Sequence, residues 1–215
     1  MNTIRLQQLM PSIFAQRTDI AGDVWGREEV CLERGQTYLL EANSGTGKSS
    51  LCSFLFGYRA DYHGRILFDE QDAHALRAGE WARLRRQSLA LLWQDLRLFP
   101  ELTAWENVQV KNQLTRHQRR GRLQDWFDRL GIADKQATPV ARLSFGQQQR
   151  VAFIRSLCQP FQFILLDEPI SHLDEANALL MAAILEEEAR RQGAGILVTS
   201  IGRRLQLNYN HHLHL

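Results

Sequence analysis

The stretch EANSGTGKSS, residues 41–50, carries the pattern that decides the fold. Gly47, Lys48 and Ser49 fit the second half of G-x-x-x-x-G-K-[ST], the pattern of loops that bind phosphate groups. Ala42 stands where the first glycine of that pattern is expected. Alanine adds only a methyl group, so we expect it to be tolerated if the residue keeps a negative φ. A motif of this kind also occurs by chance as a Ser/Gly-rich turn, so it needs support from the rest of the chain.

The segments on either side of this loop supply the context that a phosphate site needs. TYLLEA (37–42) is typical of a buried strand, and SSLCSFLFGY (49–58) of an apolar helix. Backbone N–H groups and the helix N-terminus would surround the phosphates, and Gly45 allows positive φ and close approach. Lys48 would reach the β- and γ-phosphates, and the Ser49 hydroxyl would bind Mg²⁺. The predicted nucleotide-binding residues of the loop are Asn43, Ser44, Gly45, Thr46, Gly47, Lys48, Ser49 and Ser50.

Length and charge describe an ordinary globular protein. The 215 residues suit one large domain or two small subdomains, with 44% hydrophobic and 23% charged residues. The net charge of +2 neither requires nor excludes a nucleic-acid or anionic-membrane partner. WARLRRQ (81–87) and RHQRRGRL (116–123) are arginine-rich, and we interpret them as solvated helix faces rather than polyanion sites.

Cysteine usage and hydropathy predict a cytoplasmic soluble domain. Cys31, Cys52 and Cys158 are odd in number and widely spaced, with no metal or disulfide pattern, which favours a reducing compartment. The chain has neither the apolar stretch of a signal peptide nor a run of 18 apolar residues. The histidine-containing NYNHHLHL (208–215) is interpreted as a surface strand or tail rather than a metal site.

A second group of polar residues follows another predicted strand. In FQFILLDEP (161–169), four apolar residues precede Asp167 and Glu168, which places both acids at the carboxyl end of a buried strand. Asp167 would hold Mg²⁺ through water, and Glu168 would orient and deprotonate an attacking water. The alternative is a solvated strand end.

Strands and helices alternate along the chain, which predicts a largely parallel sheet covered on both faces. The further strands are predicted at 64–69, 88–94 and 194–200, and the further helices at 122–132 and 175–193.

LSFGQQQR (143–150) adds a family-specific motif just before that strand. With it the chain closely resembles the ATP-binding subunits of ABC transporters, whose signature is LSGGQ. The resemblance covers nearly the whole length, and WQDLRLFPELTAWENV (93–108) is similar to the branch that serves lipoprotein release, macrolide export and the cell-division complex. The motifs occur in the family's order: the loop at 42–49, a Q-loop at Gln94, the signature at 143–147, the acidic strand at 163–168 and a D-loop, SHLD, at 171–174.

The resemblance implies a fold and a division of the chain. The fold is α/β: a P-loop NTPase core with an N-terminal antiparallel β subdomain and a helical signature subdomain. Residues 1–215 would form a single ABC ATPase domain. Within it, 1–94 and 161–215 would make the nucleotide-binding core with its β subdomain, and 95–160 the helical subdomain.

The resemblance also implies that two subunits pair head to tail around two ATP molecules. Ser144, Gly146 and Gln147 of one subunit would then meet the γ-phosphate bound by the other. Gln94 would contact Mg²⁺ and sense the γ-phosphate, and Asp174 would link the two sites across the dimer. We expect a second ATP-binding subunit as partner, in a homodimer, although a related chain with a complete site stays open.

An aromatic residue near the N-terminus usually stacks on adenine in this family. Phe14 is the candidate, with Trp25 or a role in the core as open alternatives. The segment around Gln94 would contact the coupling helix of an integral membrane, permease-like subunit. These relationships predict a peripheral location on the cytoplasmic face of the cell membrane and no direct contact with nucleic acid.

Three residues depart from the family's pattern. Ala42 replaces the first glycine of the loop, and Phe145 replaces the first glycine of LSGGQ, the third position of that signature. Ser200 stands where the family has a switch histidine, and serine can hydrogen-bond a phosphate without carrying a positive charge. His172, in the D-loop, would either substitute for that histidine in part or serve packing or the surface.

Three functions remain open at this stage. The first is an ATPase that binds Mg-ATP and drives or gates a membrane partner, with Glu168, Gln94 and Ser200 as the catalytic residues. The second is an ATP-dependent regulatory clamp with slow or no hydrolysis, which Ser200 and Phe145 favour. The third is a soluble ABC protein acting on DNA or ribosomes. Such proteins usually carry coiled-coil inserts or paired cassettes, and neither is seen in this sequence.

Overall fold

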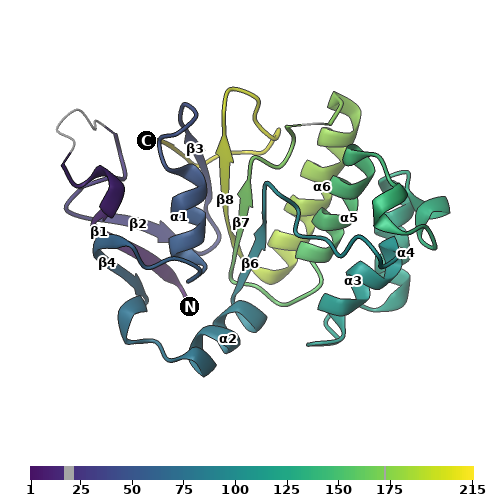
Figure 1. Cartoon of the computed structure of the whole chain (residues 1–215), viewed down its shortest axis with the longest axis horizontal. Coiled ribbons are helices and arrows are strands. Elements are labelled where there is room, and N and C mark those ends of the chain that lie inside the picture. The colour runs from purple at the N-terminus through teal and green to yellow at the C-terminus, as the bar shows by residue number, and fades with distance from the viewer. Residues whose placement is uncertain (17–21, 172) are drawn as a thin grey trace.

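The computed structural model describes residues 1–16, 22–171 and 173–215, which form two sheets flanked by helices (Figure 1). His172 lies outside the described residues, so the prediction for it is not taken further. The four-stranded sheet has antiparallel pairs in the order β2-β1-β4-β5: β2 (Val30–Glu33), β1 (Thr3–Pro11), β4 (Tyr62–Phe68) and β5 (Gln71–Asp72). The five-stranded sheet has parallel pairs in the order β6-β7-β8-β3-β9: β6 (Leu89–Leu92), β7 (Phe163–Asp167), β8 (Gly195–Ser200), β3 (Thr37–Glu41) and β9 (His211–His214).

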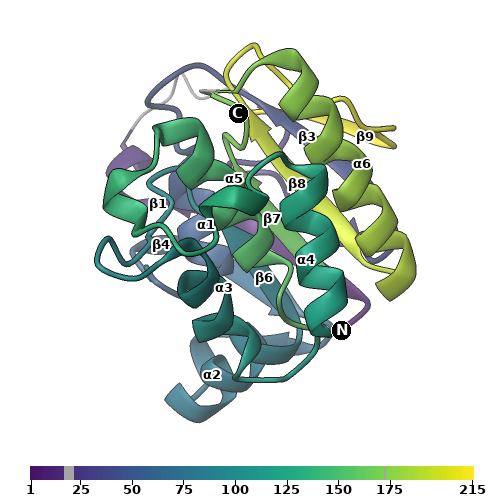
Figure 2. The same cartoon turned by 90° about the vertical axis from the view of Figure 1, so that its right-hand side faces the viewer.

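Six α-helices in the described residues pack around these sheets. In Figure 2 the helices between β6 and β7, together with the long helix after β7, lie in front of the parallel sheet. The helix after β3 and the antiparallel sheet lie on its other side (Figure 1). The helices are α1 (Lys48–Leu55), α2 (Ala78–Gln87), α3 (Ala104–Asn112), α4 (Arg120–Arg129), α5 (Phe145–Ser156) and α6 (Glu175–Gln192).

Alternate residues of the parallel strands pack into two different cores. On β7, Ile164 and Leu166 join the cluster beneath α3 to α6, whereas Phe163 and Leu165 join the cluster shared with α1 and the antiparallel sheet. Side chains on a strand alternate between its faces, so a strand buried on both sides is apolar without interruption. The predicted parallel sheet, covered on both faces, is confirmed.

Two segments that we interpret from the sequence as surface segments form an edge strand and an exposed helix. NYNHHLHL supplies β9, an edge strand whose His211 ring stacks on Tyr38 with centroids 4.7 Å apart. The arginine-rich residues 81–87 fall on α2, which buries none of its residues. Among the described residues, no helix is long and apolar enough to cross a bilayer.

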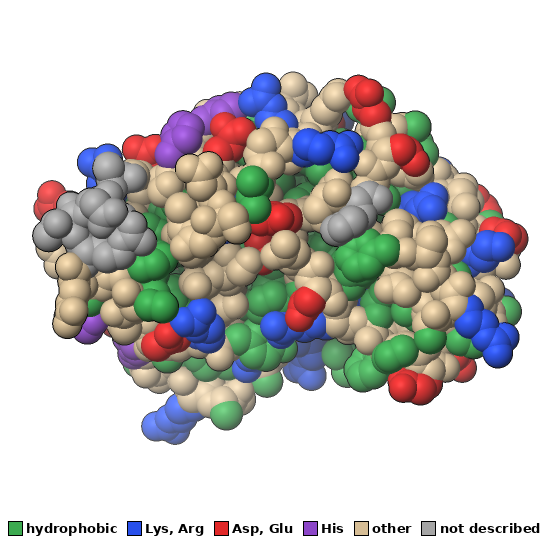
Figure 3. Space-filling view, turned by 45° about the horizontal axis from the view of Figure 1, so that its top comes forward, with side chains coloured by type: hydrophobic (Ala, Val, Ile, Leu, Met, Phe, Trp, Pro, Cys, Tyr) green, Lys and Arg blue, Asp and Glu red, His purple; other side chains and the backbone are tan. Residues whose placement is uncertain are grey.

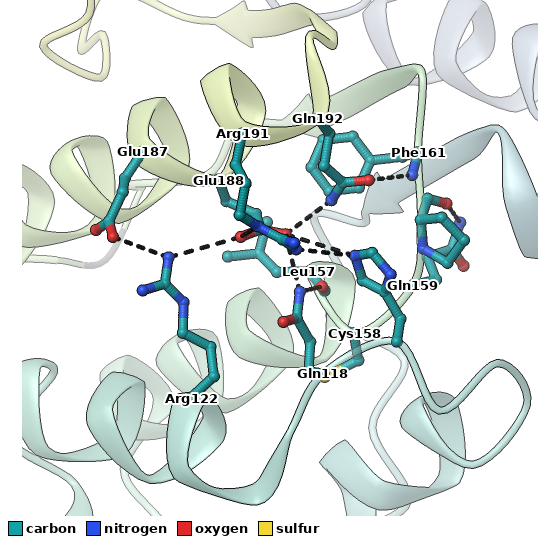
Figure 4. Close-up of polar contacts among 12 residues, drawn as sticks. Gln118, Arg122, Leu157, Cys158, Gln159, Phe161, Glu187, Glu188, Arg191 and Gln192 are labelled. Atoms are coloured by element: carbon teal, nitrogen blue, oxygen red, sulfur yellow. Dashed lines mark hydrogen bonds and ion pairs between the residues drawn. The ribbon is translucent and has the colours of Figure 1, made fainter.

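One polar side chain of the arginine-rich 116–123 segment is buried and ties several elements together. Gln118 donates from Nε2 to the Glu188 carboxylate on α6 (2.8 Å) and to the Leu157 carbonyl after α5 (3.1 Å) (Figure 4). The Glu188 carboxylate is fully buried and also accepts from Gln192 and Arg191. Burial on its own would raise the pKa of Glu188. Hydrogen bonds from His117, Arg191 and Gln118 outweigh that effect and lower the pKa to about 2.

We therefore predict that Glu188 contributes to stability only while it is ionised. A carboxyl whose pKa falls from 4.5 to about 2 on folding contributes about 3 kcal/mol above pH 4.5, and this is lost as the pH falls toward 2. Glu188→Gln should lower the free energy of unfolding in urea at pH 7 by about 2 to 3 kcal/mol. Because the glutamine does not titrate, its difference from the unmodified chain should shrink below pH 4.5.

Glu187→Gln is the matched control, because this neighbouring carboxylate is 45% exposed and pairs with Arg122 and Arg129 at the surface. Exposed ion pairs of this kind contribute below about 1 kcal/mol. Equal losses of stability in the two variants at pH 7 would contradict the role assigned to Glu188.

Candidate functional site

The loop between β3 and α1 has the backbone geometry of a phosphate-binding loop. Gly45 and Gly47 have φ values of 82° and 99°, a region that favours glycine. A Cβ at Gly47 would also lie 3.0 Å from the Trp25 ring and 3.2 Å from the Phe14 ring, so the side chains behind the loop leave no room for one. Ala42 is not among the described residues with positive φ, and its N–H donates to the Ser200 carbonyl. This conformation explains why alanine is tolerated at that position.

Lys48, the first residue of α1, lies between the loop and the acidic strand. Its Nζ donates to the carbonyls of Ala42 (3.0 Å) and Asn43 (2.8 Å) and lies 3.7 Å from Glu168 Oε1. The side chain is 4% exposed, and this burial lowers the pKa of Lys48, an effect that the carboxylates of Glu168 and Asp167 oppose. The amine is thereby held as a buried cation against the face of the loop.

The two acids lie where β7 ends. Asp167 is buried, and its Oδ1 accepts a hydrogen bond from Thr199 Oγ1 (2.7 Å) on the neighbouring strand β8. Glu168 has a positive φ of 48°, and its Oε2 accepts from Gln94 Nε2 (3.2 Å). Lys48, Gln94 and Glu168, from three distant parts of the sequence, therefore meet at one place.

These residues open onto a cavity of about 330 Å³ at the edge where the parallel strands end. Figure 3 looks toward this edge and shows a recess with an acidic group at its centre and hydrophobic side chains nearby. The described residues that line the cavity are Ile13, Phe14, Ser44, Gly45, Gly47, Lys48, Ser49, Ser50, Arg59, Gln94, Glu168 and Ile201.

Two of the predicted loop residues do not line this cavity but support the loop from within. Thr46 donates from Oγ1 to the carbonyl of Asn43 (2.8 Å), which closes the turn. The Thr46 carbonyl in turn accepts from Trp25 Nε1 (2.9 Å). Asn43 and Thr46 therefore contribute to the shape of the loop.

The residues predicted to hold Mg²⁺ offer oxygen atoms only. They are the Ser49 hydroxyl, the Asp167 carboxylate and the Gln94 side-chain carbonyl. Hard oxygen donors with few carboxylates suit Mg²⁺, which keeps several waters and binds substrate phosphates as well. Among the described residues, no cluster of three His, Cys, Asp or Glu side chains offers an alternative metal site. The residues present therefore fit Mg²⁺.

The two aromatic residues considered for stacking on adenine lie in different surroundings. Phe14, in the short 3₁₀ helix Ser12–Phe14, is half-buried and lines the cavity. Trp25 is 4% exposed and belongs to the core shared by α1 and the antiparallel sheet. The position of Phe14 agrees with stacking on a base, which stays a prediction, whereas Trp25 supports the loop.

The signature residues lie at the start of α5, and none of them is among the described residues that line the cavity. Ser144 is the N-cap: its hydroxyl accepts from the Gln147 N–H (3.3 Å), and Gln147 Oε1 accepts from the Ser144 N–H (3.0 Å). This capping box stabilises the helix N-terminus that carries Gly146. Phe145, in the same turn, is 43% exposed. A contact between these residues and a nucleotide in this cavity would need a second subunit.

Asp174 caps α6 in a similar way. Its carboxylate accepts from the backbone N–H (2.8 Å) and the side-chain amide (2.7 Å) of Asn177, and the backbone hydrogen bond is the main reason why the pKa of Asp174 is lowered. Arg150 on α5 donates to Asn177 Oδ1 (2.9 Å). The signature helix and the D-loop are thereby connected within one chain, away from the cavity.

Ser200 ends β8, and its hydroxyl is turned away from the cavity. The side chain is 1% exposed, and Oγ donates to the Arg203 carbonyl in the turn that follows. Arg203 itself donates from Nη2 to the Leu173 carbonyl (3.0 Å), just before α6. The next residue, Ile201, lines the cavity in its place. A catalytic role for Ser200 stays a prediction.

Sequence reasoning missed four residues of this site. Thr199 contacts both acids, but a β-branched residue in AGILVTS signals only a strand, and its contact depends on strand register. Arg59 donates to Ser50 Oγ (3.0 Å) and pairs with Asp61, which no local pattern announces. Ile13, in the 3₁₀ helix Ser12–Phe14, and Ile201, in the bend after β8, line the cavity as exposed residues, where an apolar side chain carries no clear signal.

Comparison with known proteins agrees with this geometry. Residues 27–171 match the family model of ABC transporters. The ABC transporter ATP-binding protein YtrE of Bacillus subtilis is 30% identical over 168 residues, which span 77% of this chain and 73% of that protein. The macrolide export ATP-binding/permease protein MacB 2 of Aeromonas hydrophila is 34% identical over 174 residues, which span 80% of this chain but only 27% of that protein.

Solved structures show the same fold at lower identity. The dimeric structure of MJ0796, described as a bacterial ABC transporter cassette, superposes with a TM-score of 0.75 at 23% identity and covers 92% of this chain and 87% of its own. The α/β fold expected from the motifs is confirmed by this match. The family model covers well over half of the chain, and within that range the loop residues, Gln94 and Glu168 line one cavity. The chain belongs to the ABC transporter family as an ATP-binding domain.

Proposed function

We propose that this protein is the ATP-binding subunit of an ABC-type membrane complex, which binds Mg-ATP and hydrolyses it. The observation that carries the proposal is the meeting of Lys48, Gln94 and Glu168 at one cavity. Lys48 Nζ lies 3.7 Å from one oxygen of Glu168, and Gln94 donates to the other at 3.2 Å. The Lys48 cation would bind the phosphates, and the Gln94 amide would sense the γ-phosphate. The Glu168 carboxylate would activate the attacking water.

Binding would use the loop and the two walls of the cavity. The backbone N–H groups of Gly45 to Ser49 surround the β- and γ-phosphates, and Lys48 exchanges its loop carbonyls for phosphate oxygens. Ser49, Asp167 and Gln94 would hold Mg²⁺, which neutralises charge on the phosphates when bound. The Phe14 ring, which lines the cavity beside the loop, would stack on adenine.

Hydrolysis would depend on Glu168. Its carboxylate orients a water and accepts a proton from it, while the water oxygen forms a bond to the γ-phosphorus. The bond from the γ-phosphorus to the bridging oxygen breaks, and the products are ADP and phosphate. Gln94 holds the Glu168 carboxylate in place through its hydrogen bond, and Lys48 stabilises the developing charge.

A second subunit would complete each site. Ser144, Gly146 and Gln147 are not among the described residues that line the cavity of their own chain, and the N-terminus of α5 that carries them would face the γ-phosphate bound by another chain. The related cassette MJ0796 is described as dimeric. We propose a homodimer in which Asp174, capping α6, lies near the facing site.

A membrane subunit would bind at a second depression of about 520 Å³, beside the Q-loop. Tyr58 lines it and packs against Trp93, the residue before Gln94, with ring centroids 5.2 Å apart. The Arg97 guanidinium lies 3.6 Å from the centroid of the same Trp93 ring. Arg83, Arg85, Arg86 and Lys111 also line the depression, which favours an acidic partner segment. We propose a permease-like partner and a location on the cytoplasmic face of the membrane, with no direct contact to nucleic acid.

A regulatory clamp is the second candidate, and one observation favours it. The Ser200 hydroxyl donates to Arg203, so the position that holds a histidine in the family offers no positive charge to the γ-phosphate. ATP would then close the dimer and change the state of the partner, with slow turnover.

Replacing Lys48 and Glu168 separates binding from turnover. Lys48→Ala should lower both ATP affinity and ATP turnover by about tenfold or more, because it removes the charge that pairs with the phosphates. Glu168→Gln should keep the affinity within about twofold and lower turnover by about 100-fold or more. Binding of a fluorescent ATP analogue and phosphate release measure the two effects. An unchanged rate in Glu168→Gln would remove its proposed role.

Ser200→His decides between the motor and the clamp. If the protein is a motor, we expect readily measurable turnover before the substitution and a change of less than about threefold after it, within the range of a group that is not essential. A clamp predicts negligible turnover, ATP-driven dimerisation seen by light scattering, and a rise of about tenfold or more in Ser200→His.

A further inference from the structure

Thr199 lies at the centre of the acidic edge, although none of the family's motifs includes it. It is fully buried on β8, and the parallel register places it opposite Asp167 on β7. Its Oγ1 donates to Asp167 Oδ1 at 2.7 Å and accepts from the Glu168 N–H at 3.2 Å. One hydroxyl therefore contacts both acids.

The direction of these two hydrogen bonds is fixed by chemistry. An ionised carboxylate only accepts, so the hydroxyl proton must point toward Asp167. The lone pairs of the same oxygen then accept from the Glu168 backbone. The chain of donors therefore runs from the Glu168 N–H through Thr199 to Asp167.

Each bond restrains a feature that the site needs. Thr199 donates to Oδ1 of Asp167, which restrains the rotation of that carboxylate. Glu168 has a φ of 48°, a conformation that costs energy for a residue with a side chain. Its N–H bond to Thr199 helps to hold that conformation, in which the carboxylate meets Gln94 and Lys48.

We infer that Thr199 is a positioning residue for the metal-binding and water-activating acids, and that its hydroxyl lowers the Mg²⁺ concentration needed to strengthen nucleotide binding. The inference rests on the proposed function, since it concerns the same Mg-ATP site. The adjacent hydroxyl of Ser200 does not share this role, because it donates to Arg203 in the following turn.

The test compares ATP affinity with and without Mg²⁺ in the full-length chain. In Thr199→Val we expect the affinity without Mg²⁺ to stay within about twofold and the half-saturating Mg²⁺ concentration to rise by about tenfold or more, as for other residues that orient a metal ligand. Thr199→Ser keeps the hydroxyl and should restore the Mg²⁺ dependence. A fluorescent ATP analogue measures affinity, so the readout does not depend on turnover.

Thr37→Val is the matched control. It makes the same replacement on the neighbouring strand β3, at the far end of the sheet where Thr37 pairs with Ile196, and should leave the Mg²⁺ dependence unchanged. Urea unfolding of each variant measures stability separately. If Thr199→Val does not fold, Thr199→Ala removes the same hydroxyl without adding an apolar branch.

The outcomes separate the two claims. A chain that binds ATP with normal Mg²⁺ dependence in Thr199→Val overturns the role of Thr199 and leaves the proposed function intact. Loss of Mg²⁺ dependence in Thr199→Ser as well would also overturn it, because the hydroxyl is still there. A chain that binds no ATP before any substitution overturns both.

Discussion

The site depends on the parallel pairing of β8 with its two neighbours, β7 and β3. Asp167 pairs with Thr199, and Leu40 on β3 pairs with Thr199 from the other side. Because the strands run in the same direction, the loop after β3, the acids after β7 and the turn after β8 all emerge at one edge. A shift of one residue in either pairing would turn Asp167 or Thr199 to the opposite face of the sheet. The apolar cores on both faces hold this register.

The polar residues at that edge are held by bonds that satisfy each of them. Lys48 is buried but donates to two carbonyls, Asp167 is buried but accepts from Thr199, and Glu168 accepts from Gln94. Burial of an unpaired charge would be costly, so each contact both stabilises the fold and orients a group toward the cavity. Glu188 is satisfied in the same way: its hydrogen bonds with Gln118 and Gln192 join α6 to the segment before α4 (Figure 4).

Much of the fold could be predicted because its signals are local. The apolar run before Asp167 and the glycines of the loop each specify backbone structure within a few residues, and both predictions agree with the structure. Thr199 and Glu188 could not be found in this way. Thr199 matters through the residue opposite it in the register. Glu188 is one of three consecutive glutamates, and only its buried position on α6 distinguishes it from a solvated one. Phe14 and Trp25 are equally aromatic in sequence, and only packing separates them.

The turn after β8 connects the rim of the cavity with the start of α6. The Arg203 backbone holds Ser200 at the end of the strand, while its side chain holds the Leu173 carbonyl ahead of α6. One residue thus acts as a strut of fixed length between the rim of the cavity, at Ile201, and the cap of the longest helix, at Asp174. Displacement of the rim would therefore either move that cap as well or break the hydrogen bond between Arg203 and Leu173.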